Sequence, residues 1–80
     1  MISVFAVLRN NGDGSSSICW FDGSEVCIEE LLELEERDPE TWGSGEGLQV
    51  NHFRYPDDFD FDLCGIQFSD IEEIRLDLNP

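Results

Sequence analysis

The sequence predicts an α+β domain in which an antiparallel sheet of four or five strands packs one amphipathic helix on a face. Residues 48–55 alternate in hydropathy as strands do, and residues 2–9 alternate weakly, whereas residues 24–37 repeat their apolar positions with a helical period. Ile, Leu, Val and Phe supply 24 of 80 residues, well above the roughly 20% below which highly charged chains stay unfolded. We therefore expect residues 1–80 to fold as a single acidic domain.

The first strand and hairpin are predicted from residues 2–21. Residues 2–9 are apolar on both faces, which is typical of a central strand covered on both sides. Residues 10–14, Asn-Asn-Gly-Asp-Gly, are turn formers that tolerate a positive φ. Residues 17–21 then form a short second strand.

The helix is expected over residues 24–37. Asp22 is a candidate N-cap, with Glu25 completing a capping box. Around the helix axis, one arc is apolar and the opposite arc is acidic. The apolar arc holds Cys27, Ile28, Leu31, Leu32 and Leu34. Asp38 and Pro39 end the helix.

The second half of the chain is expected to return to strands. Residues 41–47 form a flexible loop, and residues 48–55 form a strand that Pro56 ends. Residues 58–63 alternate Asp with apolar side chains and predict another strand, which residues 66 and 68 continue after a bend at Gly65. Residues 69–72 suggest one helical turn or a tight connection, and residues 74–78 alternate as a last strand.

The net charge of −15, from 19 acids and four arginines, limits the possible partners. Nucleic acid and anionic membranes both require a basic patch, and the arginines are scattered along the sequence. We expect no direct binding to either. The charge is also about twice the upper end of what suits a small domain, so it costs stability through self-repulsion.

The acids concentrate in two segments that flank a basic one. Residues 22–46 carry a net charge of −9 and residues 57–80 carry −7, whereas residues 47–56 carry +1. Like-charged glutamates at i, i+4 lower helix stability, as is expected at a functional surface. The candidate partner-binding acids are Glu25, Glu29, Glu30, Glu33, Glu36, Asp57, Asp58, Asp60, Asp62, Glu72 and Glu73.

Aromatic side chains are the candidate anchors of an interface. Trp42 and Tyr55 each flank an acidic segment and are expected to contact a partner, whereas Trp20 is expected in the core. The alternative for the acids is a solvated outer face that only maintains solubility.

The sequence contains few residues or motifs that indicate catalysis, cofactor binding or metal binding. The single histidine, His52, is expected at the surface of a strand, and nothing marks a nucleophile. Asp58, Asp60 and Asp62 resemble the start of a calcium loop but lack its later glycine and glutamate. We expect no enzyme, no cofactor and no metal.

The cysteines and the N-terminal segment indicate the cellular compartment of the protein. Cys19, Cys27 and Cys64 form an odd set inside apolar runs, which suggests buried free thiols in a reducing cytoplasm. The apolar N-terminus has no basic region or cleavage site and is too short to span a bilayer. A cytoplasmic location is expected.

In size, acidity, carboxylate-rich segments (residues 25–36 and 57–62) and absence of a catalytic motif, the chain resembles phage DNA-mimic inhibitors of the anti-restriction and anti-CRISPR type. The resemblance includes no alignable motif. It implies an acidic face that occupies the basic nucleic-acid groove of a CRISPR effector, a restriction enzyme or a nuclease. Glutamates spaced about 3.3 Å apart along a helix would approximate the roughly 3.4 Å phosphate spacing of one DNA strand.

Two other functions remain open. The chain could be an immunity protein or antitoxin that neutralises a basic toxin, because residues 65–78 look like the closing strands of small immunity domains. It could instead be an assembly subunit that oligomerises through strand edges, with its charge serving only solubility. The oligomeric state is left open by the sequence.

Overall fold

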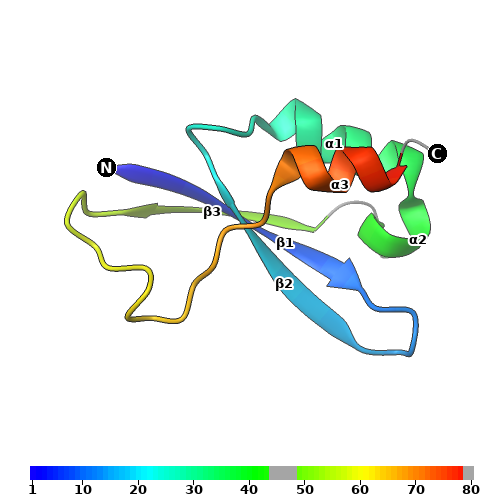
Figure 1. The fold of residues 1–80 in the computed structure, drawn as a ribbon, viewed down its shortest axis with the longest axis horizontal. Coiled ribbons are helices and arrows are strands. Elements are labelled where there is room, and N and C mark those ends of the chain that lie inside the picture. The colour runs from blue at the N-terminus through cyan, green and yellow to red at the C-terminus, as the bar shows by residue number, and fades with distance from the viewer. Residues whose placement is uncertain (44–48, 79–80) are drawn as a thin grey trace.

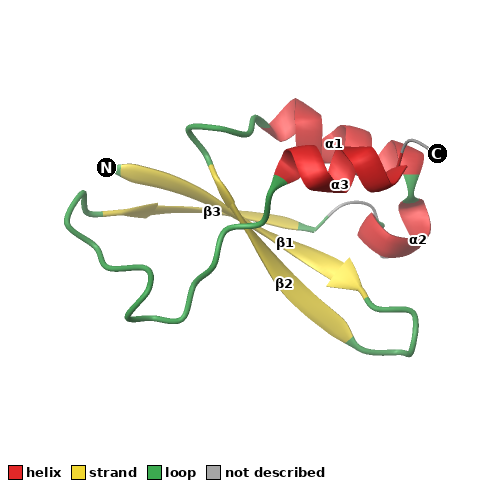
Figure 2. Ribbon diagram, viewed as in Figure 1, coloured by secondary structure: helices red, strands yellow, loops and turns green. Residues whose placement is uncertain are grey.

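The computed structural model describes residues 1–43 and 49–78. Three antiparallel strands form one sheet in the order β2-β1-β3, and three helices accompany it within those residues (Figures 1 and 2). The α+β class is confirmed. The expected four or five strands and single helix are wrong, because two predicted strands are a loop and a helix. The elements are β1 (Ile2–Asn10), β2 (Ser16–Asp22), α1 (Ile28–Arg37), α2 (Pro39–Trp42), β3 (Val50–Tyr55) and α3 (Ile71–Leu78).

Strand β1 is the central strand, as the sequence predicts, and both of its faces are covered. Phe5 pairs with Phe21 on one side and His52 on the other. Val7 lies on the same face and is fully buried in the core beneath the helices. Val4 points to the opposite face and is also fully buried. A strand apolar on both faces therefore forms the middle of the sheet.

The hairpin between β1 and β2 follows the predicted turn. Gly12 and Gly14 adopt φ values of 86° and 91°, a region that side chains disfavour. Asn11 N–H donates to the carbonyl of Ser15 at 3.1 Å. The Asp13 carboxylate accepts hydrogen bonds from the hydroxyl and the backbone N–H of Ser15.

The Asp13 carboxyl should titrate below its ordinary pKa of 3.8. The Ser15 hydroxyl and backbone N–H stabilise its charged form and so lower its pKa. Because the folded pKa is lowered, this contribution is present above the unfolded pKa and is lost as the pH falls through the folded pKa. A carbon-detected NMR titration of Asp13 measures the midpoint, and Ser15→Ala should return it toward 3.8. An unshifted midpoint would contradict the turn geometry.

Helix α1 begins at Ile28, four residues later than predicted. The Asp22 carboxylate accepts from the N–H of Ser24 at 2.9 Å and so closes a tight turn instead of capping the helix. The backbone N–H of Glu25 also donates to the carbonyl of Asp22. The expected capping box is therefore wrong, and Glu25 lies in a turn. The N-cap residue Cys27 makes no side-chain cap hydrogen bond.

The short helix α2 places Trp42 in the core. Asp38 caps α2 by accepting from the N–H of Thr41 at 3.3 Å, and Pro39 occupies its first turn. Trp42 is only 3% exposed, and its ring lies 6.4 Å from that of Phe21. The prediction of Trp42 as an exposed interface anchor is thus wrong. Most of the expected loop, residues 44–47, lies outside the described residues, as does residue 48 of the expected strand.

Residues 56–68 form a loop with turns and not the predicted Asp/apolar strand. Phe59 and Phe61 meet each other and Tyr55 instead of alternating along a sheet face. The segment returns to the sheet at Phe68, which forms an isolated parallel bridge with Trp20. Aromatic packing therefore replaces strand pairing here.

Helix α3 replaces the predicted last strand. The Asp70 carboxylate accepts from the N–H of Glu72 at 3.0 Å, which supports a helix start. Ile71, Ile74 and Leu78 are spaced for one helix face and pack into the core. Leu76 is 72% exposed, whereas the predicted alternating strand would have buried it. This helix removes the feature that suggested immunity domains, because residues 71–78 are not closing strands.

The core lies between the sheet and the helices. It contains Val7, Phe21, Val26, Leu31, Leu34, Trp42 and Ile71. All three cysteines are free, but Cys27 and Cys64 are exposed and Cys19 is half-buried, so the prediction of buried thiols is wrong for two of them. No helix among the described residues has the length and apolar character needed to cross a bilayer.

Candidate protein-binding surface

Acidic side chains of α1 and α3 lie on neighbouring helices. The guanidinium of Arg75 on α3 contacts the carboxylate of Glu30 on α1 at 3.2 Å. This contact joins two helices that lie side by side (Figure 1). Glu72 lies 4.0 Å from the same guanidinium. We define the helical acidic surface as the candidate partner-binding carboxylates that lie on these two helices: Glu29, Glu30, Glu33, Glu36, Glu72 and Glu73.

The helical acidic surface is exposed and only partly neutralised. Glu29, Glu36 and Glu73 are exposed. Arg37 pairs with Glu33 at 3.0 Å, and Arg75 serves both Glu30 and Glu72. Exposed pairs of this kind contribute about 0 to 1 kcal/mol each. Carboxylates outnumber cations on both helices, so the surface keeps a negative potential that could attract a basic partner.

Leucine side chains project from the same helices. Leu32 of α1 is 45% exposed, although the sequence placed it on the buried arc. Leu76 of α3 lies in the turn after Glu72 and Glu73 and is more exposed still. Both are apolar contacts that the sequence reasoning missed. The burial of Leu31 and Leu34 shows why, because the core-facing arc is narrower than the apolar arc of the sequence.

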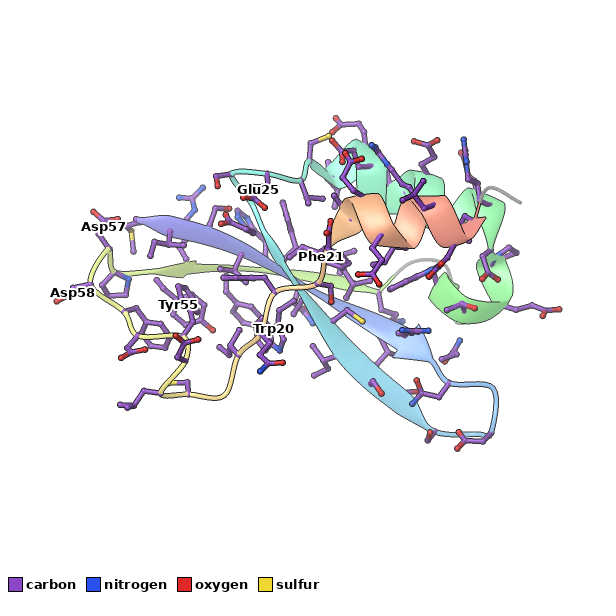
Figure 3. The ribbon with its side chains drawn as sticks, viewed as in Figure 1. Trp20, Phe21, Glu25, Tyr55, Asp57 and Asp58 are labelled. Carbon is purple, nitrogen blue, oxygen red and sulfur yellow. The ribbon has the colours of Figure 1, made fainter. Side chains whose placement is uncertain are left out.

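The second acidic segment, residues 57–62, lies at the other end of the molecule (Figures 1 and 3). Asp57 pairs with the N-terminal ammonium of Met1 at 2.9 Å, and Asp60 accepts from the N–H of Leu63 at 3.1 Å. Asp58 and Asp62 are exposed. The helices and this acidic loop therefore do not form one surface, and two of its four aspartates have local partners.

Tyr55 is half-buried in an aromatic cluster that holds the acidic loop against the sheet. Its ring centroid lies 4.4 Å from Phe59 and 5.3 Å from Phe61. Phe61 also lies 5.2 Å from Phe68. Figure 3 shows Tyr55 between β3 and this loop. Its predicted role as an exposed anchor is replaced, in this arrangement, by packing within the chain.

Phe61→Ala should loosen the acidic loop without unfolding the sheet. The ring of Phe61 joins Tyr55, Phe59 and Phe68, so its removal should lower the free energy of unfolding by about 2 kcal/mol, less than for a fully buried ring. Limited proteolysis within residues 57–66 should become faster. The control is Leu63→Ala, whose side chain is 86% exposed. Equal proteolysis rates for the two variants would contradict the cluster's role.

The remaining candidate residues have ordinary surroundings. His52 is exposed, as predicted, stacks on Phe5 with centroids 4.9 Å apart and shares a hydrogen bond with the hydroxyl of Ser3. Glu25 lies in the exposed turn before α1 (Figure 3). Within residues 1–43 and 49–78, no three His, Cys, Asp or Glu side chains are placed to hold a metal ion, and this includes the aspartates of residues 58–62.

Comparisons with protein families, with curated proteins and with solved structures found no match to this chain. The arrangement of its own charged and apolar side chains is therefore what supports a functional proposal.

Proposed function

We propose that this protein is a small acidic inhibitor whose helical acidic surface occupies the basic nucleic-acid groove of a host defence complex, such as a CRISPR effector or a restriction enzyme. The observation that carries the proposal is the contact between Arg75 and Glu30, which places the carboxylates of α1 and α3 together. Each carboxylate that meets a groove lysine or arginine would replace a phosphate contact.

The charge of the helices supports fast but salt-sensitive association. Long-range attraction between a −15 protein and a basic groove raises the association rate and is screened by salt. Charge alone contributes more to rate and specificity than to affinity. Leu32 and Leu76 are exposed on the same helices and would supply the apolar contacts in place of Trp42 and Tyr55.

The helices require one change to the mimicry that the sequence suggested. Glu25 lies outside α1, so the regular spacing of charge along one axis covers only Glu29 to Glu36. The aspartates of residues 57–62 lie in a loop, so they do not recur at strand spacing. The proposed surface consequently uses two helices that lie side by side.

The experiment is capture by the immobilised protein from a panel of purified CRISPR effector complexes, restriction enzymes and basic nucleases, at low and high salt. We expect selective capture of one defence complex that falls by at least about tenfold when salt rises from about 0.05 to 0.5 M. Capture of a nuclease toxin alone would contradict the proposal and favour an immunity protein. If no complex is captured at low salt, the inhibitor proposal is also contradicted, and the negative charge would serve only solubility.

A further inference from the structure

The outer edge of β3 presents backbone groups that nothing in the described part of the chain engages. Leu8 N–H donates to the carbonyl of Gln49, which makes these two residues a hydrogen-bonded pair of the β1–β3 ladder. Such pairs alternate along antiparallel strands, so Asn51, Phe53 and Tyr55 also direct their backbone groups toward β1. The N–H and C=O groups directed away from the sheet are those of Val50, His52 and Arg54.

The opposite edge of the sheet, on β2, is partly closed. Ser69 N–H donates to the carbonyl of Trp20 at 2.7 Å, where Phe68 and Ser69 lie beside the strand. The carbonyl of Asp22 accepts from Glu25 and Val26 in the turn that follows β2. A continuous strand therefore cannot pair along the whole of this edge without breaking these hydrogen bonds. Among the described residues, β3 is therefore the edge that stays open along its whole length, and association through a single self-complementary edge closes at two copies.

The charge of β3 is compatible with a second copy of itself. Residues 49–55 contain no acid, and the exposed side chains of His52 and Arg54 are the only ionisable ones besides Tyr55. The acidic loop and the helices carry the net charge elsewhere. Two copies of a −15 protein that meet at β3 therefore place no carboxylate against another along the paired residues.

We propose that the protein self-associates through β3, with the β3 strands of two copies antiparallel, so that two three-stranded sheets become one continuous sheet. One register gives hydrogen-bond partners to the outward N–H and C=O groups of all three residues. In it, His52 faces His52 of the second copy, and Val50 faces Arg54. On the face of the sheet that carries Val4, opposite the helices, Phe53 lies across from Asn51 of the second copy. Phe53 is 41% exposed. This proposal does not depend on the inhibitor function.

The dimer should be weak and should strengthen with salt. Because β3 has only six residues, we expect the paired strands to bury less than the roughly 1,200 Å² of standard stable interfaces. The net charges of the two copies repel each other, and salt screens that repulsion. Higher salt should thus favour self-association, whereas it should weaken binding of the helical acidic surface to a basic partner. The two associations can be distinguished by the sign of their salt dependence.

The first test combines sedimentation equilibrium with amide hydrogen exchange at protein concentrations up to about 1 mM. We expect dimers in about 0.5 M NaCl, and exchange at Val50, His52 and Arg54 that slows by at least about tenfold as dimers form. Asn51, Phe53 and Tyr55 should be protected at every concentration. A protein that stays monomeric, or dimers that leave the three outward amides unprotected, would overturn the proposal.

The second test cross-links the two copies through β3. In a variant whose three native cysteines are serine, His52→Cys places a thiol opposite its own copy at about 5.5 Å between Cα atoms, within disulfide range. Asn51→Cys is the control, because it faces Phe53 of the second copy and lies too far from its own counterpart. Mild oxidation should give covalent dimers of the first variant only. Equal cross-linking of the two would refute the register. If His52→Cys does not fold, the hydrogen-exchange pattern decides.

Discussion

Replacing Trp42 with alanine should lower the free energy of unfolding by about 3 to 5 kcal/mol, the range for large aromatic side chains removed from a core. The ring is 3% exposed, lies against Phe21 and has the guanidinium of Arg9 5.7 Å from its centroid. An 80-residue domain has a total stability of roughly 4 to 12 kcal/mol. The variant should therefore lose a quarter or more of the total stability and unfold at a much lower urea concentration than the unsubstituted protein.

Urea denaturation followed by circular dichroism measures this effect, and Leu76→Ala is the matched control. Leu76 is an apolar residue of a neighbouring helix that is 72% exposed, so its truncation should change stability by less than about 0.5 kcal/mol. A Trp42→Ala variant as stable as Leu76→Ala, but impaired in partner binding, would show that Trp42 is the exposed anchor that the sequence predicted.

Reversing two charges on α1 should weaken partner binding by about 100-fold at low salt. Glu29→Lys with Glu36→Lys replaces two exposed carboxylates of the helical acidic surface. A loss of about 1.4 kcal/mol per reversed charge, or tenfold each, is at the low end of measured couplings between close interface charges. Lysine at position 36 suits the helix C-terminus. Lysine at position 29 removes repulsion from Glu33 but places a cation in the first turn, and these two small effects oppose each other, so the fold should persist.

The control for this pair is Asp58→Lys with Asp62→Lys in the acidic loop. Both residues are exposed, and the net charge changes by the same amount. Binding measured by calorimetry or surface plasmon resonance should change by less than about fivefold, since only long-range attraction is reduced. Equal losses for the two pairs would mean that net charge alone governs binding and that the helices form no specific surface.

The parts of the fold that the sequence predicted correctly depend on local signals. Strand β1 is apolar on both faces, and the hairpin has glycines where φ is positive. Both follow from the chemistry of neighbouring residues. The end of α1 follows in the same way from Asp38 and Pro39.

The errors occur where one sequence pattern fits two structures. Ile74 and Leu78 fit both a strand that includes Leu76 and a helix that includes Ile71, and packing of Ile71 into the core favours the helix. The Asp and Phe alternation of residues 58–62 gives way to ring contacts with Tyr55. Neither choice can be made locally, because each depends on what the rest of the chain places nearby.

The same distinction holds for the candidate surface. The exposure of Glu29, Glu36 and Glu73 could be predicted, because isolated carboxylates are rarely buried. Their proximity could not, since it depends on the contact of Arg75 with Glu30 across a fold that the sequence did not reveal. The exposure of Leu32 likewise depends on the angle at which α1 meets the sheet.

The most direct test of the proposed mimicry is a competition titration with a captured defence complex and its labelled nucleic acid. If the helical acidic surface occupies the nucleic-acid groove, this protein should displace the labelled strand completely, and raising the nucleic-acid concentration should shift the midpoint in proportion. The Glu29→Lys, Glu36→Lys variant should require about 100-fold more protein. A ternary complex, in which the target binds this protein and its nucleic acid together, would contradict the account.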